Sequence, residues 1–126
     1  MKRFEDYMKH FSEVDGWFQT PAIAIWDTLL SYQQEHGISG NLLEIGVWKG
    51  KSAALAALHC QGDDACVFVD AMLLDEAKAR ISQVTPGITC HYLQEQSQFL
   101  ARHPFVSRVH GHSVGFTWMA NTVGNQ

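Results

Sequence analysis

Apolar residues recur at helical spacing through the N-terminal part of the chain. Aromatic and apolar side chains three or four positions apart predict an amphipathic helix from about Phe4 to Val14, ended by Asp15 and Gly16. A second helix is predicted from Thr20 to about His36, because a capping hydroxyl followed by proline is typical of a helix start and a glycine follows the segment. The predicted inward positions of this second helix are Ile23, Trp26, Leu29 and Leu30.

After position 40 the pattern changes to short apolar runs that alternate with helical segments. Short apolar runs between turn residues are typical of buried parallel strands, and their alternation with helices predicts right-handed crossovers. The predicted strands are Leu42–Val47, Cys66–Asp70, Ile88–Leu93 and a weaker Phe105–His110. The predicted helices are Ser52–His59, Leu73–Val84, a short segment around Ser97–Arg102 and one or two turns around Phe116–Ala120.

This pattern predicts an α/β fold with a mostly parallel sheet of about four strands and helices on both faces. We expect one domain over residues 1–126, made of N-terminal helices in 1–40, a βαβ core in 41–113 and a C-terminal tail in 114–126. We detect no internal repeat, low-complexity tract or linker in the chain.

Composition narrows the class of protein. The chain is 46% hydrophobic and 17% charged, which is typical of a globular core rather than a disordered chain. A formal net charge of −4 disfavours nucleic acid as the main partner, and the sequence predicts no membrane span, no signal peptide and a cytoplasmic location. Cys60, Cys66 and Cys90 lack metal-ligand spacing, so we expect reduced thiols and neither a disulfide nor a zinc site.

The junction between the first strand and its helix carries the candidate chemistry. Gly46 and Gly50 allow a sharp turn, and the following helix offers free N–H groups at a positive dipole end. Ser52 adds a hydroxyl there, and Glu44 is a carboxylate in an otherwise apolar strand, which predicts a cationic or hydrogen-bonding partner. Asp70 ends the second strand, where an acid can accept ribose hydroxyls.

Two other nucleotide sites share some of these parts. The segment from Gly46 to Ser52 is one residue short of a P-loop, whose amides must converge around a phosphate. The dinucleotide fingerprint needs a Gly-x-Gly pair that Val47 and Trp48 do not supply. The spacing therefore favours neither of these two sites.

The third possibility is a resemblance to class I S-adenosylmethionine (SAM)-dependent methyltransferases, in particular the small-molecule O-methyltransferase-like group. The motif Glu-x-Gly-x-x-x-Gly-x-Ser carries it, with support from Val69–Asp70 and from Gly16–Phe18. The likeness covers roughly Gly16 to Ser113 and implies a Rossmann-like fold, with SAM as cofactor and S-adenosylhomocysteine as product. The residues that it implies around the cofactor are Glu44, Gly46, Val47, Trp48, Gly50, Ser52, Asp70, Ala71, Met72 and Ser97.

Within that resemblance, residues have different expected contacts. Glu44, Gly46, Val47 and Trp48 would line or cover the methionine part of SAM, and Ser52 would bind its carboxylate. The ribose would be held at Asp70, with the adenine beside Ala71 and Met72 and near Ser97.

The chain departs from the family after the third strand. The family's acid near the fourth strand is replaced by Val109–Ser113, and only 13 residues follow Ser113, so the fold is expected to be truncated before the acceptor-binding half.

We expect a homo-oligomer formed through the exposed sheet edge or the C-terminal segment. His110 and His112 have metal-like spacing, and His91 is a third candidate ligand. Polar residues in a turn at the sheet edge commonly show the same spacing, so no metal is predicted. The expected function is methyl transfer to a small molecule, with no catalytic residue assigned, or ligand binding without turnover in an oligomeric module.

Overall fold

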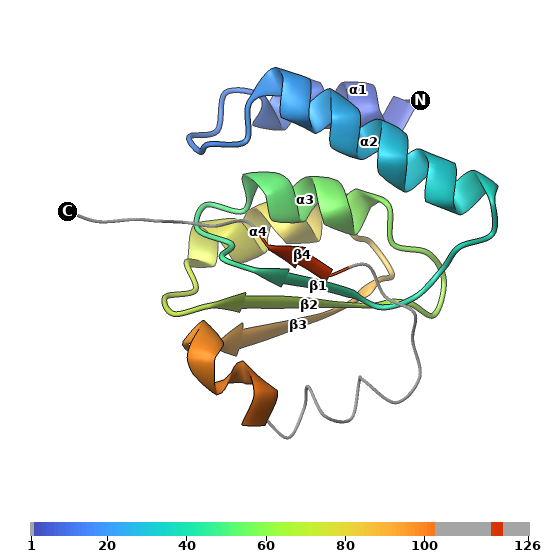
Figure 1. Cartoon of the computed structure of the whole chain (residues 1–126). Helices are drawn as coiled ribbons and strands as arrows, with labels where there is room; N and C mark the ends of the chain where they lie inside the picture. The colour runs from blue at the N-terminus through green and yellow to red at the C-terminus, as the bar shows by residue number, and fades with distance from the viewer. Residues whose placement is uncertain (1, 103–116, 120–126) are drawn as a thin grey trace.

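The computed structural model describes residues 2–102 and 117–119 (Figure 1). The helices and strands alternate along the chain after two N-terminal helices. The helices are α1 (Lys2–Phe11), α2 (Thr20–Glu35), α3 (Lys51–Leu58), α4 (Asp75–Val84) and the 3₁₀ helix η1 (Ser97–Arg102). The strands are β1 (Leu42–Ile45), β2 (Ala65–Asp70), β3 (Thr89–Gln94) and β4 (Thr117–Met119).

The strands form one parallel sheet in the order β3-β2-β1-β4. Glu44 of β1 lies opposite Phe68 of β2, and Phe68 lies opposite Tyr92 of β3. The alternation of parallel strands and helices confirms the α/β class, and the first three strands and the helices from α1 to η1 lie within a few residues of their predicted positions. None of the described helices is long and apolar enough to cross a membrane.

The α-helices lie on one side of the sheet in two layers (Figure 1). Helices α3 and α4 cover the sheet, and α1 and α2 pack over α3. The opposite side is covered in the described part only by η1, whose Leu100 packs against Val67 and Val69. The prediction of helices on both faces is therefore met on the second face only by η1. The strands β1, β2 and β3 are added to the sheet in one direction, so right-handed crossovers place α3 and α4 on the same face.

Helix α3 is the centre of the core. All eight of its residues are buried, because the sheet and α4 cover one side while α1 and α2 cover the other. A helix that is covered all round needs small or apolar side chains, which explains the Ala/Leu composition of α3. Its Ala53 and Ala56 pack in the cluster that contains Phe68 and Ile81, and its Leu55 packs in the cluster that contains Tyr7.

Three predictions need correction. The predicted helical turns around Phe116–Ala120 are replaced by β4, which pairs with β1, so strand pairing overrides a weak local preference. Leu29 is 49% exposed, because the buried side of α2 that packs over α3 is occupied by Ile23 and Leu30. Cys60 and Cys66 are joined in a disulfide rather than reduced, since the turn between α3 and β2 folds back and places the two side chains together. The predicted strand Phe105–His110 lies outside the described residues.

Close packing of two helices depends on one glycine. Gly50 precedes α3 with a φ of +85°, and a Cβ built there would lie 3.0 Å from the Cα of Ala77 in α4. Both the left-handed backbone and the contact exclude a side chain at this position.

We predict that Gly50→Ala destabilises the protein by about 1–3 kcal/mol, because it adds backbone strain and forces α3 and α4 apart. Urea denaturation followed by circular dichroism measures the loss. Gly37→Ala is the matched control, because Gly37 also has a positive φ of +67° but a Cβ there would have no neighbour within 4 Å. Equal losses in the two variants would show that the contact with Ala77 contributes nothing.

Candidate functional site at the carboxyl ends of the strands

The turn between β1 and α3 is held by backbone hydrogen bonds. The N–H of Gly46 donates to the carbonyl of Val69 at 2.8 Å, and the N–H of Gly50 donates to the carbonyl of Val47 at 2.9 Å. Gly46 and Trp48 both have positive φ, at +88° and +44°. The chain therefore reverses within a few residues and directs the N-terminus of α3 toward the carboxyl edge of the sheet, as the glycine spacing predicts.

Asp70 binds this turn from the tip of β2. Its Oδ2 atom accepts hydrogen bonds from the N–H groups of Val47 and Trp48, both at 2.8 Å. Its Oδ1 atom accepts one from the N–H of Met72 at 3.1 Å. One carboxylate thus joins the turn before α3 to the loop before α4, and its position beside the turn agrees with the predicted location of an acid at the strand tip.

Glu44 is a buried carboxyl group with one unused oxygen. The residue is 0% exposed, and its Oε1 atom accepts a hydrogen bond from the Ser52 hydroxyl at 2.6 Å. Its Oε2 atom is buried and has no hydrogen-bond partner among the described residues. Burial raises the pKa of Glu44 to about 8; the Ser52 hydrogen bond opposes this rise and the negative charge of Asp70 adds to it. Glu44 therefore has a hydrogen-bonding partner, as predicted, whereas the Ser52 hydroxyl donates to Glu44 and not to the ligand carboxylate that the resemblance implied.

Helix α1 closes the inner side of the site. The Tyr7 hydroxyl donates to the backbone carbonyl of Lys51 at 2.6 Å, and Tyr7 is buried. Burial, together with the charge of Glu44, raises the pKa of Tyr7 above its ordinary value. The Lys51 ammonium donates to the carbonyl of Ser12 at 2.9 Å, in the segment that follows α1. The start of α3 is therefore fixed from two sides by the N-terminal part of the chain.

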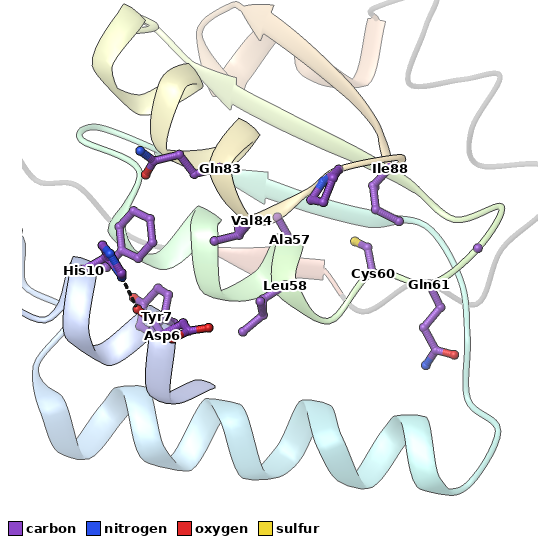
Figure 2. A pocket seen from close by; sticks show the side chains of 13 residues that line it. Asp6, Tyr7, His10, Ala57, Leu58, Cys60, Gln61, Gln83, Val84 and Ile88 are labelled. Carbon is purple, nitrogen blue, oxygen red and sulfur yellow. Dashed lines mark hydrogen bonds between the residues drawn. The ribbon is translucent and has the colours of Figure 1, made fainter. Parts of the chain in front are cut away.

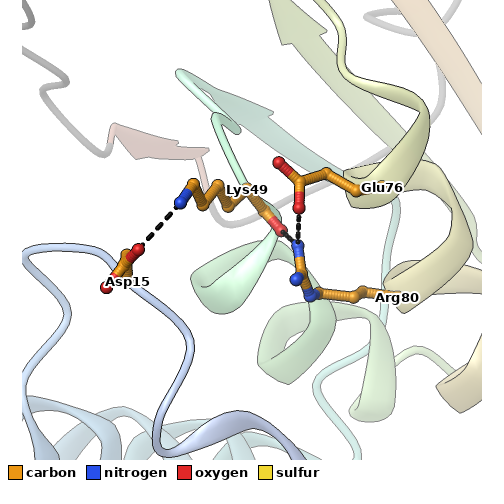
Figure 3. A network of polar contacts seen from close by, with 4 residues as sticks. All are labelled: Asp15, Lys49, Glu76 and Arg80. Atoms are coloured by element: carbon orange, nitrogen blue, oxygen red, sulfur yellow. Dashed lines mark hydrogen bonds and ion pairs between the residues drawn. The ribbon is translucent and has the colours of Figure 1, made fainter.

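The outer side of the turn is fixed by a polar network (Figure 3). The Lys49 ammonium pairs with Asp15 at 2.8 Å and lies 5.0 Å from the Trp48 ring. The Arg80 guanidinium of α4 donates to the backbone carbonyl of Lys49 at 2.8 Å and pairs with Glu76 at 3.0 Å. These contacts link the α1–α2 loop and α4 to one short turn.

The structure brings most of the predicted site residues together. Glu44 and Ser52 are bonded to each other, and Val47 and Trp48 are bonded to Asp70. Gly46 and Gly50 shape the turn, Ala71 and Met72 are exposed beside Asp70, and Ser97 begins η1 after β3.

The predicted loop residues differ in exposure, and two of the three candidate histidines lie outside the described residues. Trp48 is 42% exposed on the turn, available to a ligand, whereas Val47 is buried in the core and offers only its backbone. His110 and His112 lie outside the described residues, and His91 is on β3.

Sequence reasoning missed the residues that hold the turn from outside. Tyr7, Asp15 and Arg80 contact the turn or the start of α3 from positions more than 30 residues away in the sequence. Their local patterns are those of an ordinary amphipathic helix, a loop and a solvated helix face. Lys51 was the only residue that pointed to a contact with a distant part of the chain, because a lysine that is buried needs a hydrogen-bond acceptor.

The orientation of Lys51 also bears on the P-loop alternative. A P-loop lysine reaches back over its own turn to the phosphates. Here the Lys51 ammonium donates to the carbonyl of Ser12, so it is engaged by the segment after α1 and the geometry disfavours a phosphate site of this kind.

Comparisons with known proteins leave the family open. No protein-family model, curated protein or solved structure matches the chain.

We predict that Glu44 makes the stability of the fold depend on pH. Its pKa is about 8 in the folded protein and near its ordinary value of 4.5 when unfolded, so the folded state binds the proton more tightly. Its contribution to stability is complete below about pH 4.5 and is lost as the pH rises through about 8, by on the order of a few kcal/mol. The free energy of unfolding of the wild type should therefore fall between pH 5 and 8 relative to Glu44→Gln. Parallel pH profiles for the two proteins would contradict the prediction.

Proposed function

We propose that the chain binds S-adenosylmethionine or S-adenosylhomocysteine at the carboxyl ends of β1 and β2. The observation that carries the proposal is the Oε2 atom of Glu44, which is buried beside the N-terminus of α3 and has no hydrogen-bond partner in the part of the chain that the structure describes. The amino-acid part of such a ligand carries both an ammonium donor and a carboxylate. An ammonium group satisfies a buried carboxyl oxygen, and a carboxylate is favoured at a helix N-terminus.

The remaining residues fit the nucleoside part of that ligand. Asp70 presents a carboxylate at the tip of β2, where ribose hydroxyls could donate to it alongside the backbone N–H groups that it already accepts. Met72 is 68% exposed next to it and offers an apolar surface for the adenine. Trp48 offers a second exposed ring at the turn.

The proposed chemistry is methyl transfer to a small acceptor. When bound, SAM supplies a methyl group on a positively charged sulfur, and transfer proceeds by in-line displacement. The protein then contributes mainly orientation. In this chain Glu44 would hold the amino group, the turn would fix the amino-acid part, and the rigid contacts of Lys49 and Lys51 would keep the turn in place. Binding without turnover is the alternative function, and an acceptor panel separates the two once ligand binding is established.

We predict that S-adenosylhomocysteine binds the wild type and that Met72→Ala weakens this binding by about three- to tenfold, through loss of apolar contact. Isothermal titration calorimetry measures both affinities. Met72 is exposed, so the variant should keep the fold. Ile25→Ala is the matched control, because Ile25 is a 60% exposed apolar residue on α2. Gly46→Arg, checked for folding, should abolish binding by filling the turn. No binding by the wild type at millimolar ligand would contradict the proposal.

We also propose that two copies associate through a sheet edge. Among the described strands β3 pairs only with β2, so its other edge presents backbone groups that a second chain could pair.

Light scattering after size-exclusion chromatography should therefore give a mass near twice 14.1 kDa at micromolar concentration. A mass of one chain over the whole accessible concentration range would overturn the association.

A further inference from the structure

A groove lies at the opposite end of the sheet from the site described above. It has a volume of about 740 Å³, within the range of about 300–1,000 Å³ that is usual for small-molecule sites. Figure 2 shows that α1 supplies one wall, while the ends of α3 and α4 and the segments that follow them supply the other. These segments lead into β2 and β3, so the groove lies at the amino ends of the strands.

The groove combines an apolar surface with acceptors of hydrogen bonds. Phe11, Leu58 and Val84 line it with aromatic and aliphatic carbon. Asp6 contributes a carboxylate from α1. The Nδ1 atom of His10 lies 2.7 Å from the carbonyl of Asp6, so Nδ1 must be the donor, and in the neutral ring Nε2 is left as an acceptor.

Two helix ends and one carboxylate favour positive charge in the groove. Leu58 and Val84 are the last residues of α3 and α4, so two helix C-termini border it, and helix C-termini favour positive charge. Among the described residues that line the groove none is lysine or arginine. No fixed positive charge from these residues offsets Asp6. An anionic ligand is therefore disfavoured, whereas a cation is favoured by Asp6 and by the helix ends.

We propose that this groove binds small organic cations that carry an aromatic or alkyl group. The apolar part would lie against Phe11, Leu58 and Val84, and the positive charge would lie toward Asp6 and the helix ends. This site is separate from the nucleoside site at the other end of the strands. Its occupancy depends neither on Glu44 nor on Asp70.

Titration of ¹⁵N-labelled protein with benzyltrimethylammonium tests the proposal, with benzyl alcohol as the neutral probe and benzenesulfonate as the anionic one. Backbone amide shifts at Gln61, Gly62 and Gln83 should report binding in the groove. We expect the cation to bind about three- to tenfold more tightly than the alcohol, and the sulfonate to bind least. A cation that binds no better than the alcohol, or shifts confined to other regions, would overturn the proposal.

Two exposed positions allow charge to be changed with the fold intact. Asp6→Asn should weaken binding of the cation about threefold, and Gln83→Lys should weaken it at least as much by adding a positive charge at the rim. The matched controls are Asp75→Asn and Ala79→Lys, which make the same charge changes at exposed positions of α4 outside the groove. Equal effects in variants and controls would show that only net charge matters and would refute a site in the groove. Binding of S-adenosylhomocysteine should be the same in Asp6→Asn and Gln83→Lys as in the wild type, which separates this proposal from the previous one.

Discussion

The carboxylate of Asp70 is the contact on which the carboxyl edge of the sheet depends. A turn with Trp48 in a left-handed conformation directs two successive N–H groups to the same side, where a single anion can accept both. One oxygen of Asp70 accepts both, and the other accepts from Met72. The turns that start α3 and α4 are thereby fixed to a single anion, and every other candidate group is placed relative to them.

Two acidic residues at this edge have opposite surroundings. Asp70 accepts three backbone N–H groups, which stabilise a negative charge. Glu44 is fully buried, accepts one hydroxyl and is repelled by Asp70, so its neutral form is favoured. A cationic ligand group would reverse the balance at Glu44 and leave Asp70 unchanged. The pair therefore offers one carboxylate that fixes the turns and one buried acid whose charge can respond to what binds.

The parts of this site that lie close together in the sequence were predictable from it, and the parts that close it from outside were not. Glycine spacing predicted the turn from Gly46 to Gly50, because only a few residue types allow such backbone angles. The position of Asp70 followed from the end of an apolar strand. Tyr7, Asp15 and Arg80 were not predictable, because contacts over more than 30 residues depend on how helices pack and leave no local pattern. The prediction for residues 116–120 was wrong for the same reason, since β4 is specified by its neighbour β1.

The parallel topology also gives the two ends of the sheet opposite electrostatic character. Each crossover returns the chain in the same direction, so the N-termini of α3 and α4 gather at the carboxyl ends of the strands and their C-termini gather at the amino ends. Asp70 and the acidic first turn of α4 lie at the positive end, where negative charge is favoured. Asp6 lies at the other end, beside two helix C-termini of like sign, and gains nothing from them. A bound cation would be favoured by Asp6 on one wall of the groove and by the helix C-termini on the other, so the two walls favour the same sign of ligand charge.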